Sequence, residues 1–169
     1  MSRGRMRAST AQRLKVPLER LYATFNHTES VVDPVHLVRR YADPVDREVV
    51  AFCASALAFG RVANVLTTTE SLLSVLGRSP AAFVHEFNPA RDGSSIRPLL
   101  HRWIRGVDLI ALLWILKQMI REAGSIESFF LSGCTTSESD VGPALDRFSA
   151  RALAIDLDEL YKGYTGRRG

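Results

Sequence analysis

Apolar residues recur every three or four positions along much of the chain, which is the spacing of an amphipathic helix. Leu14, Leu18, Leu21 and Phe25 show it first and predict a helix over residues 10–25, in which Pro17 lies in the first turn or produces a kink. The same reasoning predicts helices over residues 34–41, 44–59, 61–76, 80–87, 108–121, 126–130 and 143–160. After its polar first turn, the segment 44–59 is apolar on all sides, as expected for a buried central helix, and 108–121 is predicted to be a second one.

Helix boundaries are marked by capping residues. Three predicted starts place a capping side chain before proline, which fits the first helical position: Asp33-Pro34, Asp43-Pro44 and Ser79-Pro80. Ser125 is expected to cap the helix over residues 126–130, and Gly77 and Gly124 to end the two helices that precede them. Polar and glycine-rich composition predicts loops over Asn88–Ser95 and Ser132–Asp140, and Ile96–Arg105 is interpreted as a helix interrupted at Pro98.

These elements define an all-α fold, an irregular multi-helix bundle with buried central helices. The sequence shows no strand pattern of any length and no internal repeat. We divide the chain into a disordered basic N-terminus (1–10), a helical domain (11–160) and a disordered tail (161–169). Because an amphipathic helix is followed by the unpatterned end YKGYTGRRG, we interpret the domain as incomplete and the tail as the product of a truncation or frameshift.

Composition narrows the classes of function only slightly. The net charge of +4 permits a nucleic-acid partner without requiring one. The apolar runs fall short of the roughly 20 residues that a membrane span needs, so no membrane partner is expected. Cys53 and Cys134 lie in different segments and no Cys/His spacing typical of a metal site occurs, so we expect no metal, no cofactor and a cytoplasmic location. Cys53, on a buried helix, should be chemically inert.

An acidic cluster opens the helix over residues 44–59. Asp43, Asp46 and Glu48 could bind a hard cation, but helix capping accounts for all three more simply. Asp43 and Asp46 have the spacing of a capping box.

Two short segments are candidates for ligand contact. Phe59-Gly60-Arg61 is a tight turn between two buried helices, either a plain corner or a loop presented to a ligand. The run His101-Arg102-Trp103-Ile104-Arg105 places two guanidinium groups near an aromatic ring. It is either a phosphate contact with a stacking platform or an amphipathic surface helix whose Trp103 faces the core.

A family resemblance adds to this interpretation. The blocks DPVHLVRRYADPVDREVVAFCASALAFGRVANVL, SLLSVLGRSPAAFV, HRWIRGVDLIALLWIL and GSIESFF resemble the N-terminal half of an uncharacterised bacterial family that carries a domain of unknown function. The resemblance runs from about Leu18 to Leu160. It implies that a later Asp-Val-His stretch, preceded by a Gly-Ser-Ala-Cys-Lys-Arg-like segment, belongs to the full-length protein.

The segment 41–65 is also distantly similar to the opening of the helix-hairpin-helix DNA glycosylases. In those enzymes the equivalent turn approaches DNA where a base is flipped out. The similarity implies a DNA-facing role for Gly60, Arg61 and Asn64, although a glutamine-containing loop of the glycosylases is replaced here by Ala58-Phe59-Gly60-Arg61. It also implies that the catalytic aspartate lies outside this chain, which would then contribute no catalytic residue.

We therefore expect double-stranded DNA as the partner, in DNA binding or DNA repair by the full-length form. The nucleic-acid-binding candidates are Gly60, Arg61, Asn64, His101, Arg102 and Arg105. The alternative is a non-enzymatic helical module that binds a protein partner through exposed apolar surface.

Overall fold

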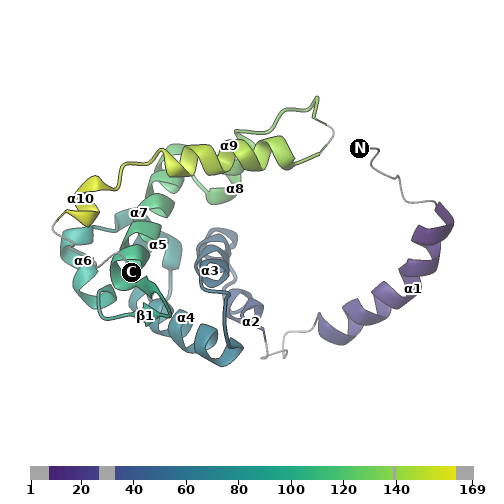
Figure 1. The fold of residues 1–169 in the computed structure, drawn as a ribbon, viewed down its shortest axis with the longest axis horizontal. Coiled ribbons are helices and arrows are strands. Elements are labelled where there is room, and N and C mark those ends of the chain that lie inside the picture. Colours follow the sequence, from purple (N-terminus) through teal and green to yellow (C-terminus); the bar gives the residue numbers. More distant parts are fainter. Residues whose placement is uncertain (1–7, 27–32, 139, 163–169) are drawn as a thin grey trace.

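The computed structural model describes residues 8–26, 33–138 and 140–162, and this part of the chain is almost entirely helical (Figure 1). The elements in chain order are α1 (Ala8–Phe25), α2 (Val35–Arg39), α3 (Pro44–Ala56), α4 (Val62–Leu76), α5 (Pro80–Glu86), α6 (Pro89–Ile96), β1 (Leu100–His101), β2 (Ile104–Arg105), α7 (Gly106–Ala123), α8 (Ile126–Leu131), α9 (Gly142–Leu153) and α10 (Asp158–Tyr161). The all-α prediction is confirmed, and the single departure within the described ranges is a two-stranded hairpin.

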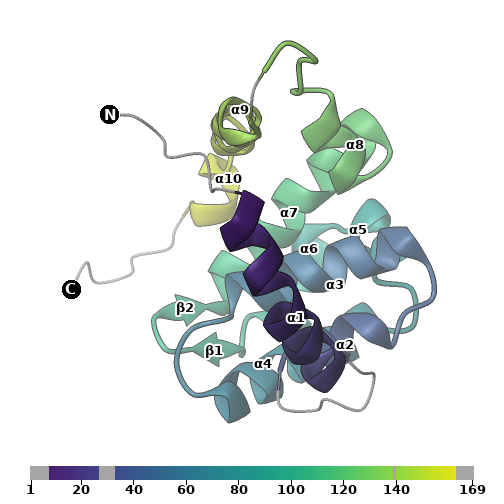
Figure 2. The ribbon, with the colours of Figure 1, turned by 90° about the vertical axis from the view of Figure 1, so that its right-hand side faces the viewer.

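Helix α7 lies at the centre of the fold. It packs against α5, α6, α8 and α10, and both views place it among the other helices (Figures 1 and 2). The core around it is built from aliphatic and aromatic side chains, and the largest that are fully buried include Phe87, Phe129, Leu37, Leu57, Leu72, Ile96, Leu109, Leu113, Leu116 and Met119. The prediction that residues 44–59 and 108–121 form buried central helices is therefore confirmed, with slightly different boundaries.

The acidic cluster stabilises three different helices. Asp43 accepts a hydrogen bond from the N–H of Val45 (2.8 Å) and caps α3. Asp46 does not turn back to complete the expected capping box. Its Oδ1 accepts from the N–H of Ala81 in α5 (2.8 Å), although Ser79 was the predicted cap of that helix and makes no capping hydrogen bond.

Glu48 extends this arrangement to α8. Its Oε2 accepts from the N–H groups of Ile126 (2.7 Å) and Glu127 (3.1 Å), while Ser125 caps the same helix locally through the N–H of Ser128. Capping was the correct function for all three acids, but Asp46 and Glu48 cap helices distant in sequence. These contacts join α3 to α5 and to α8.

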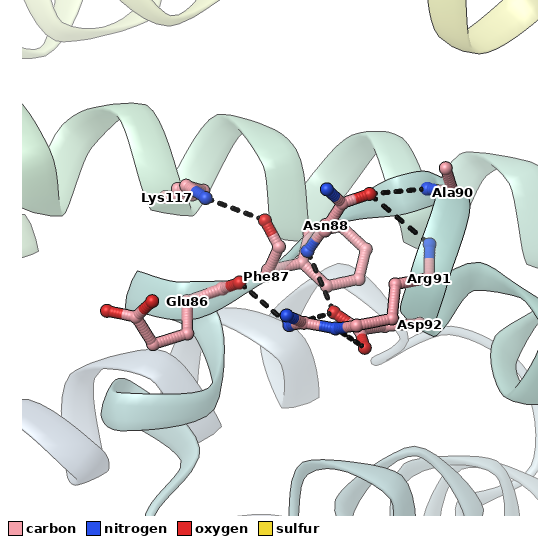
Figure 3. A network of polar contacts seen from close by, with 7 residues as sticks. All are labelled: Glu86, Phe87, Asn88, Ala90, Arg91, Asp92 and Lys117. Atoms are coloured by element: carbon pink, nitrogen blue, oxygen red, sulfur yellow. Dashed lines mark hydrogen bonds and ion pairs between the residues drawn. The ribbon is translucent and has the colours of Figure 1, made fainter.

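The prediction of a loop over Asn88–Ser95 was wrong, because Asn88-Pro89 starts helix α6. The Asn88 side chain accepts from the N–H groups of Ala90 (2.9 Å) and Arg91 (3.2 Å), as the Asp-Pro pair does at α3. The Asp92 carboxylate in turn accepts a hydrogen bond from the N–H of Asn88 (2.8 Å). These contacts are part of the polar network shown in Figure 3. The composition alone predicts a loop, because Gly93 and the two serines that follow it are residues common in loops.

Two other boundaries differ from expectation. The segment Ile96–Arg105 is not an interrupted helix, since Leu100 pairs with Arg105 and His101 with Ile104 in an antiparallel hairpin. The single helix predicted over residues 143–160 is divided into α9 and α10. The Tyr161 side chain, assigned to a disordered tail, donates from its hydroxyl to Asp108 Oδ1 (3.0 Å) and holds α10 to α7. Residues 163–169 lie outside the described part.

Helix α1 stands apart from the other helices in Figure 1. It begins at Ala8, so the last three residues assigned to the N-terminal tail are helical, while residues 1–7 lie outside the described part. It continues through Pro17, which lies beyond the first turn. Its predicted apolar face is exposed to solvent, with relative exposures of 42% for Leu14, 57% for Leu18, 54% for Leu21 and 65% for Phe25. Among the described helices, none is long and apolar enough to cross a membrane.

Candidate nucleic-acid interface

The predicted tight turn connects α3 to α4. Gly60 has a φ of 99°, a conformation that side chains with a Cβ rarely adopt. Arg61 follows in extended conformation, and its carbonyl accepts from the N–H groups of Asn64 (2.9 Å) and Val65 (3.1 Å) in the first turn of α4. The turn therefore places Arg61 and Asn64 at the exposed start of this helix.

The β1–β2 hairpin brings a second basic segment to the same place. Its tip is Arg102-Trp103, and Arg102 has a φ of 56°, which allows the two short strands to reverse direction. A Cβ built on Gly60 would lie 3.1 Å from a guanidinium nitrogen of Arg102. Figure 2 shows the hairpin with β1 beside α4. Glycine at position 60 thus provides both the turn conformation and the room for the Arg102 side chain.

His101 connects the hairpin to the turn. It is only 2% exposed, and its Nε2 lies 3.1 Å from the carbonyl oxygen of Phe59. Because a carbonyl can only accept, Nε2 carries the proton and donates, and Nδ1 lies 3.2 Å from the hydroxyl of Thr68. The ring also packs edge-on against Phe59, with centroids 4.9 Å apart. His101 is thus a buried support of the site.

Trp103 is exposed, contrary to the interpretation that turned it into the core. Its exposed fraction is 68%, and its ring stacks on Phe59 with centroids 4.7 Å apart and planes inclined by 16°. The Arg102 guanidinium carbon lies 5.1 Å from the centre of the Trp103 ring. The surface helix expected here does not form, and the hairpin takes its place. In the hairpin, His101 is buried and Trp103, two residues later, is exposed.

Four of the six candidate residues line one hollow of about 210 Å³: Arg61, Asn64, His101 and Arg102. Gly60 adjoins it through Arg102, whereas Arg105 lines a separate hollow of about 370 Å³ together with Arg97. The remaining lining residues of the first hollow are Phe59, Thr67, Thr68 and Leu100. The two threonines were missed, although Thr68 lies four residues after Asn64 and so on the same face of α4.

Charge and hydrogen-bonding capacity in this hollow favour an anion. Its lining offers two guanidinium groups, an amide and hydroxyls, and includes no aspartate or glutamate. Arginine and short polar side chains of this kind supply many of the contacts to nucleic-acid phosphates. The described residues contain no group of three or more His, Cys, Asp or Glu side chains that could hold a metal ion.

The two thiols should differ sharply in reactivity. Burial raises the pKa of Cys53 to about 12, whereas Cys134 is exposed. Since the thiolate is the reactive form, we expect the native protein to react rapidly with one equivalent of a disulfide reagent such as Ellman's reagent, and the denatured protein with two. A C134S variant should show no rapid phase in the native state. Rapid modification of Cys53 in that variant would contradict the predicted burial.

Comparison with known proteins assigns the chain to a family. Residues 33–165 match the model of a family described as protein of unknown function (DUF2400). Because this match covers most of the chain, the protein belongs to that family. No match was found among curated proteins, and none among solved structures. The expected resemblance to an uncharacterised family is therefore confirmed, and α1 precedes the matched region.

Proposed function

We propose that the surface formed by the α3–α4 turn and the β1–β2 hairpin binds the phosphate backbone of double-stranded DNA. The observation that carries this proposal is the convergence of Arg61 and Arg102, from separate segments, on a hollow without acidic lining residues. The exposed Trp103 beside them adds an aromatic surface. The distant similarity of residues 41–65 to the helix-hairpin-helix DNA glycosylases supports the same ligand, and a role of the full-length protein in DNA repair.

The site is suited to positioning DNA without reading its sequence. Its donors are long, flexible guanidinium groups and short polar side chains, which contact phosphates irrespective of the base. Arg102 is held near Gly60 and Trp103, so part of its conformational freedom is already restricted before binding. We therefore expect similar affinity for duplexes of different sequence and a steep decrease of affinity with salt.

The test compares a double variant, in which Arg61 before α4 and Arg102 in the hairpin are both replaced by glutamine, with a control variant that loses an arginine outside the proposed interface. In R61Q/R102Q both charges are removed, and we expect the affinity for a fluorescein-labelled duplex, measured by anisotropy, to fall by about tenfold or more. The slope of log affinity against log salt should decrease in magnitude by roughly two, because each guanidinium that no longer neutralises a phosphate reduces it by about one.

The matched control is R78Q. Arg78 is exposed and follows the last turn of α4, so it lies at the opposite end of the helix from Arg61. The fifteen residues of α4 separate these ends by roughly 22 Å, well beyond the reach of one hollow. A decrease in log affinity for R78Q half as large as that for R61Q/R102Q, or larger, would indicate a general charge effect, because R78Q removes one charge and the double variant two. An unchanged affinity of the double variant would refute the proposed interface.

The exposed face of α1 favours a second candidate function, that of a protein-interaction module. Leu14, Leu18, Leu21 and Phe25 present apolar surface that no described helix covers. Binding of a protein partner through this face would depend little on salt, because apolar contacts release few counterions. Substituting Leu18 and Leu21 by serine, which leaves the net charge unchanged, should greatly weaken such binding and leave the affinity for DNA unchanged, which separates the two functions.

A further inference from the structure

Another cavity, lined by residues other than those of the proposed DNA-binding hollow, lies elsewhere in the described part of the chain. It has a volume of about 890 Å³, is partly open to solvent, and is lined by residues of α6, α7, α10 and the segment that connects α9 to α10. This volume falls within the range of roughly 300–1,000 Å³ that small-molecule sites occupy. Figure 1 shows α10 beside α6, at the end of the molecule opposite α1.

One wall of this cavity is an apolar face of the central helix. Val107, Ile110 and Trp114 follow one another at intervals of three and four residues, so they line a single face of α7. Ile155 and Leu160 add apolar lining from the α9–α10 connection and from α10, and the hydrogen bond between Tyr161 and Asp108 ties α10 to α7. Burial of an apolar molecule against these side chains would be favourable in proportion to the area covered.

A cationic group without a partner marks one end of the cavity. Arg97 lines it beside Val107 and is exposed, and its guanidinium makes no ion pair or hydrogen bond within the described residues. Two carboxylates also line the cavity, but both are engaged. Glu159 pairs with Lys162 (3.1 Å), and Asp156 accepts from the N–H of Asp158 (2.9 Å), a hydrogen bond that leaves its negative charge in place. Of the two cationic lining residues, Lys162 is paired, so the Arg97 guanidinium is the one that can pair with an anionic ligand.

A polar side chain marks the opposite end. Gln118 lines the cavity, and its buried amide nitrogen has no hydrogen-bond acceptor among the described residues. Its neighbour Lys117 donates to the carbonyl of Phe87 (2.7 Å), which places this end beside the start of α6. The stretch of α7 from Val107 to Gln118 spans roughly 16 Å. The apolar residues of this wall therefore lie between a cationic group at one end and an amide at the other.

We propose that this cavity binds an elongated apolar carboxylate, with its carboxylate on Arg97 and its hydrocarbon part along Val107, Ile110 and Trp114. The guanidinium matches a carboxylate with two parallel charge-assisted hydrogen bonds. An acceptor at the far end of the ligand would be satisfied by the amide nitrogen of Gln118. The length of the apolar wall favours a medium-chain or aryl-alkyl acid over a compact one.

Decanoate is a suitable probe, because it is an elongated apolar carboxylate. Its binding can be followed through the fluorescence of Trp114, which lines the cavity. In a W103F background Trp114 is the remaining tryptophan, and decanoate below its micelle concentration should change its fluorescence in a saturable manner. Titration calorimetry of the wild-type protein should give the same dissociation constant. The uncharged 1-decanol should bind more weakly, since it lacks the group that pairs with Arg97.

Three variants decide the outcome. R97Q should raise the dissociation constant of decanoate about tenfold without altering that of 1-decanol, and R78Q should alter neither. A90F should reduce the binding of both molecules, because Ala90 lines the cavity from α6. Equal affinity of R97Q and wild type, undiminished binding to A90F, or no saturable binding at all would each overturn the proposal. Dimers in sedimentation experiments that A90F dissociates would assign the cavity to a second copy instead.

Discussion

Replacement of Gly106 by alanine is expected to lower the free energy of unfolding by about 3 kcal/mol or more, because among the described glycines it is the one whose added Cβ would approach backbone atoms most closely. A Cβ at this position would lie 2.4 Å from the carbonyl oxygen of Ile96 and 2.5 Å from the Cα of Arg97. Both atoms belong to the backbone at the end of α6, so no rotation of a side chain can relieve the clash. The first turn of α7 or the end of α6 must move.

Urea denaturation followed by circular dichroism would measure this effect. G124A is the matched control, because Gly124 has a φ of 87° but its Cβ would meet no atom within 4 Å. That variant carries only the backbone cost of a left-handed conformation, about 1 kcal/mol. If G106A were no less stable than G124A, the close packing of α6 on the start of α7 would be incorrect.

Replacement of Glu48 by alanine is expected to cost about 2 kcal/mol and to loosen α8 selectively. The Glu48 carboxylate accepts two backbone N–H groups, those of Ile126 and Glu127, across 78 and 79 residues of sequence. Ile126 is buried, so its N–H has no ready access to water after the carboxylate is removed. The variant therefore lacks a capping interaction between helices and carries an unsatisfied donor.

Amide hydrogen exchange distinguishes this effect from general destabilisation. In E48A the amides of α8 should exchange faster through local opening, while those of α4 should follow the global free energy of unfolding. E48Q provides the control, since its side-chain carbonyl still accepts a hydrogen bond and should retain about half of the stabilisation. Uniform acceleration in all helices of E48A would contradict a local capping role.

The helical fold could be predicted because its signals are local. The apolar period of α7 and the Asp43-Pro44 start of α3 depend on residues within one or two turns, where capping and burial act. The same argument failed at Asn88-Pro89, where the start signal was present but the following Gly93 and serines suggested a loop. Helix α6 is stabilised instead by the Asn88–Asp92 pair and by contact with α7.

The candidate site could be predicted only as separate pieces. Gly60, Arg61 and Asn64 were identified as one group and His101, Arg102 and Arg105 as another. The tertiary structure joins the first group to His101 and Arg102 and places Arg105 elsewhere. The burial of His101 and exposure of Trp103 follow from the hairpin, whose two-residue strands are too short to leave an alternating pattern in the sequence.

The sequence by itself determined the helical class, the two central helices, most helix starts and the burial of Cys53, because each depends on neighbouring residues or on an apolar surface that must be buried. Only the tertiary structure decided which helices Asp46 and Glu48 cap, that a hairpin lies beside α4, and that α6, α7 and α10 line a common cavity. These features depend on hydrogen bonds and packing between segments tens of residues apart. Short, polar contacts of this kind leave no periodic signal along the chain, and they form only after the apolar faces of the helices have fixed the arrangement of the backbone.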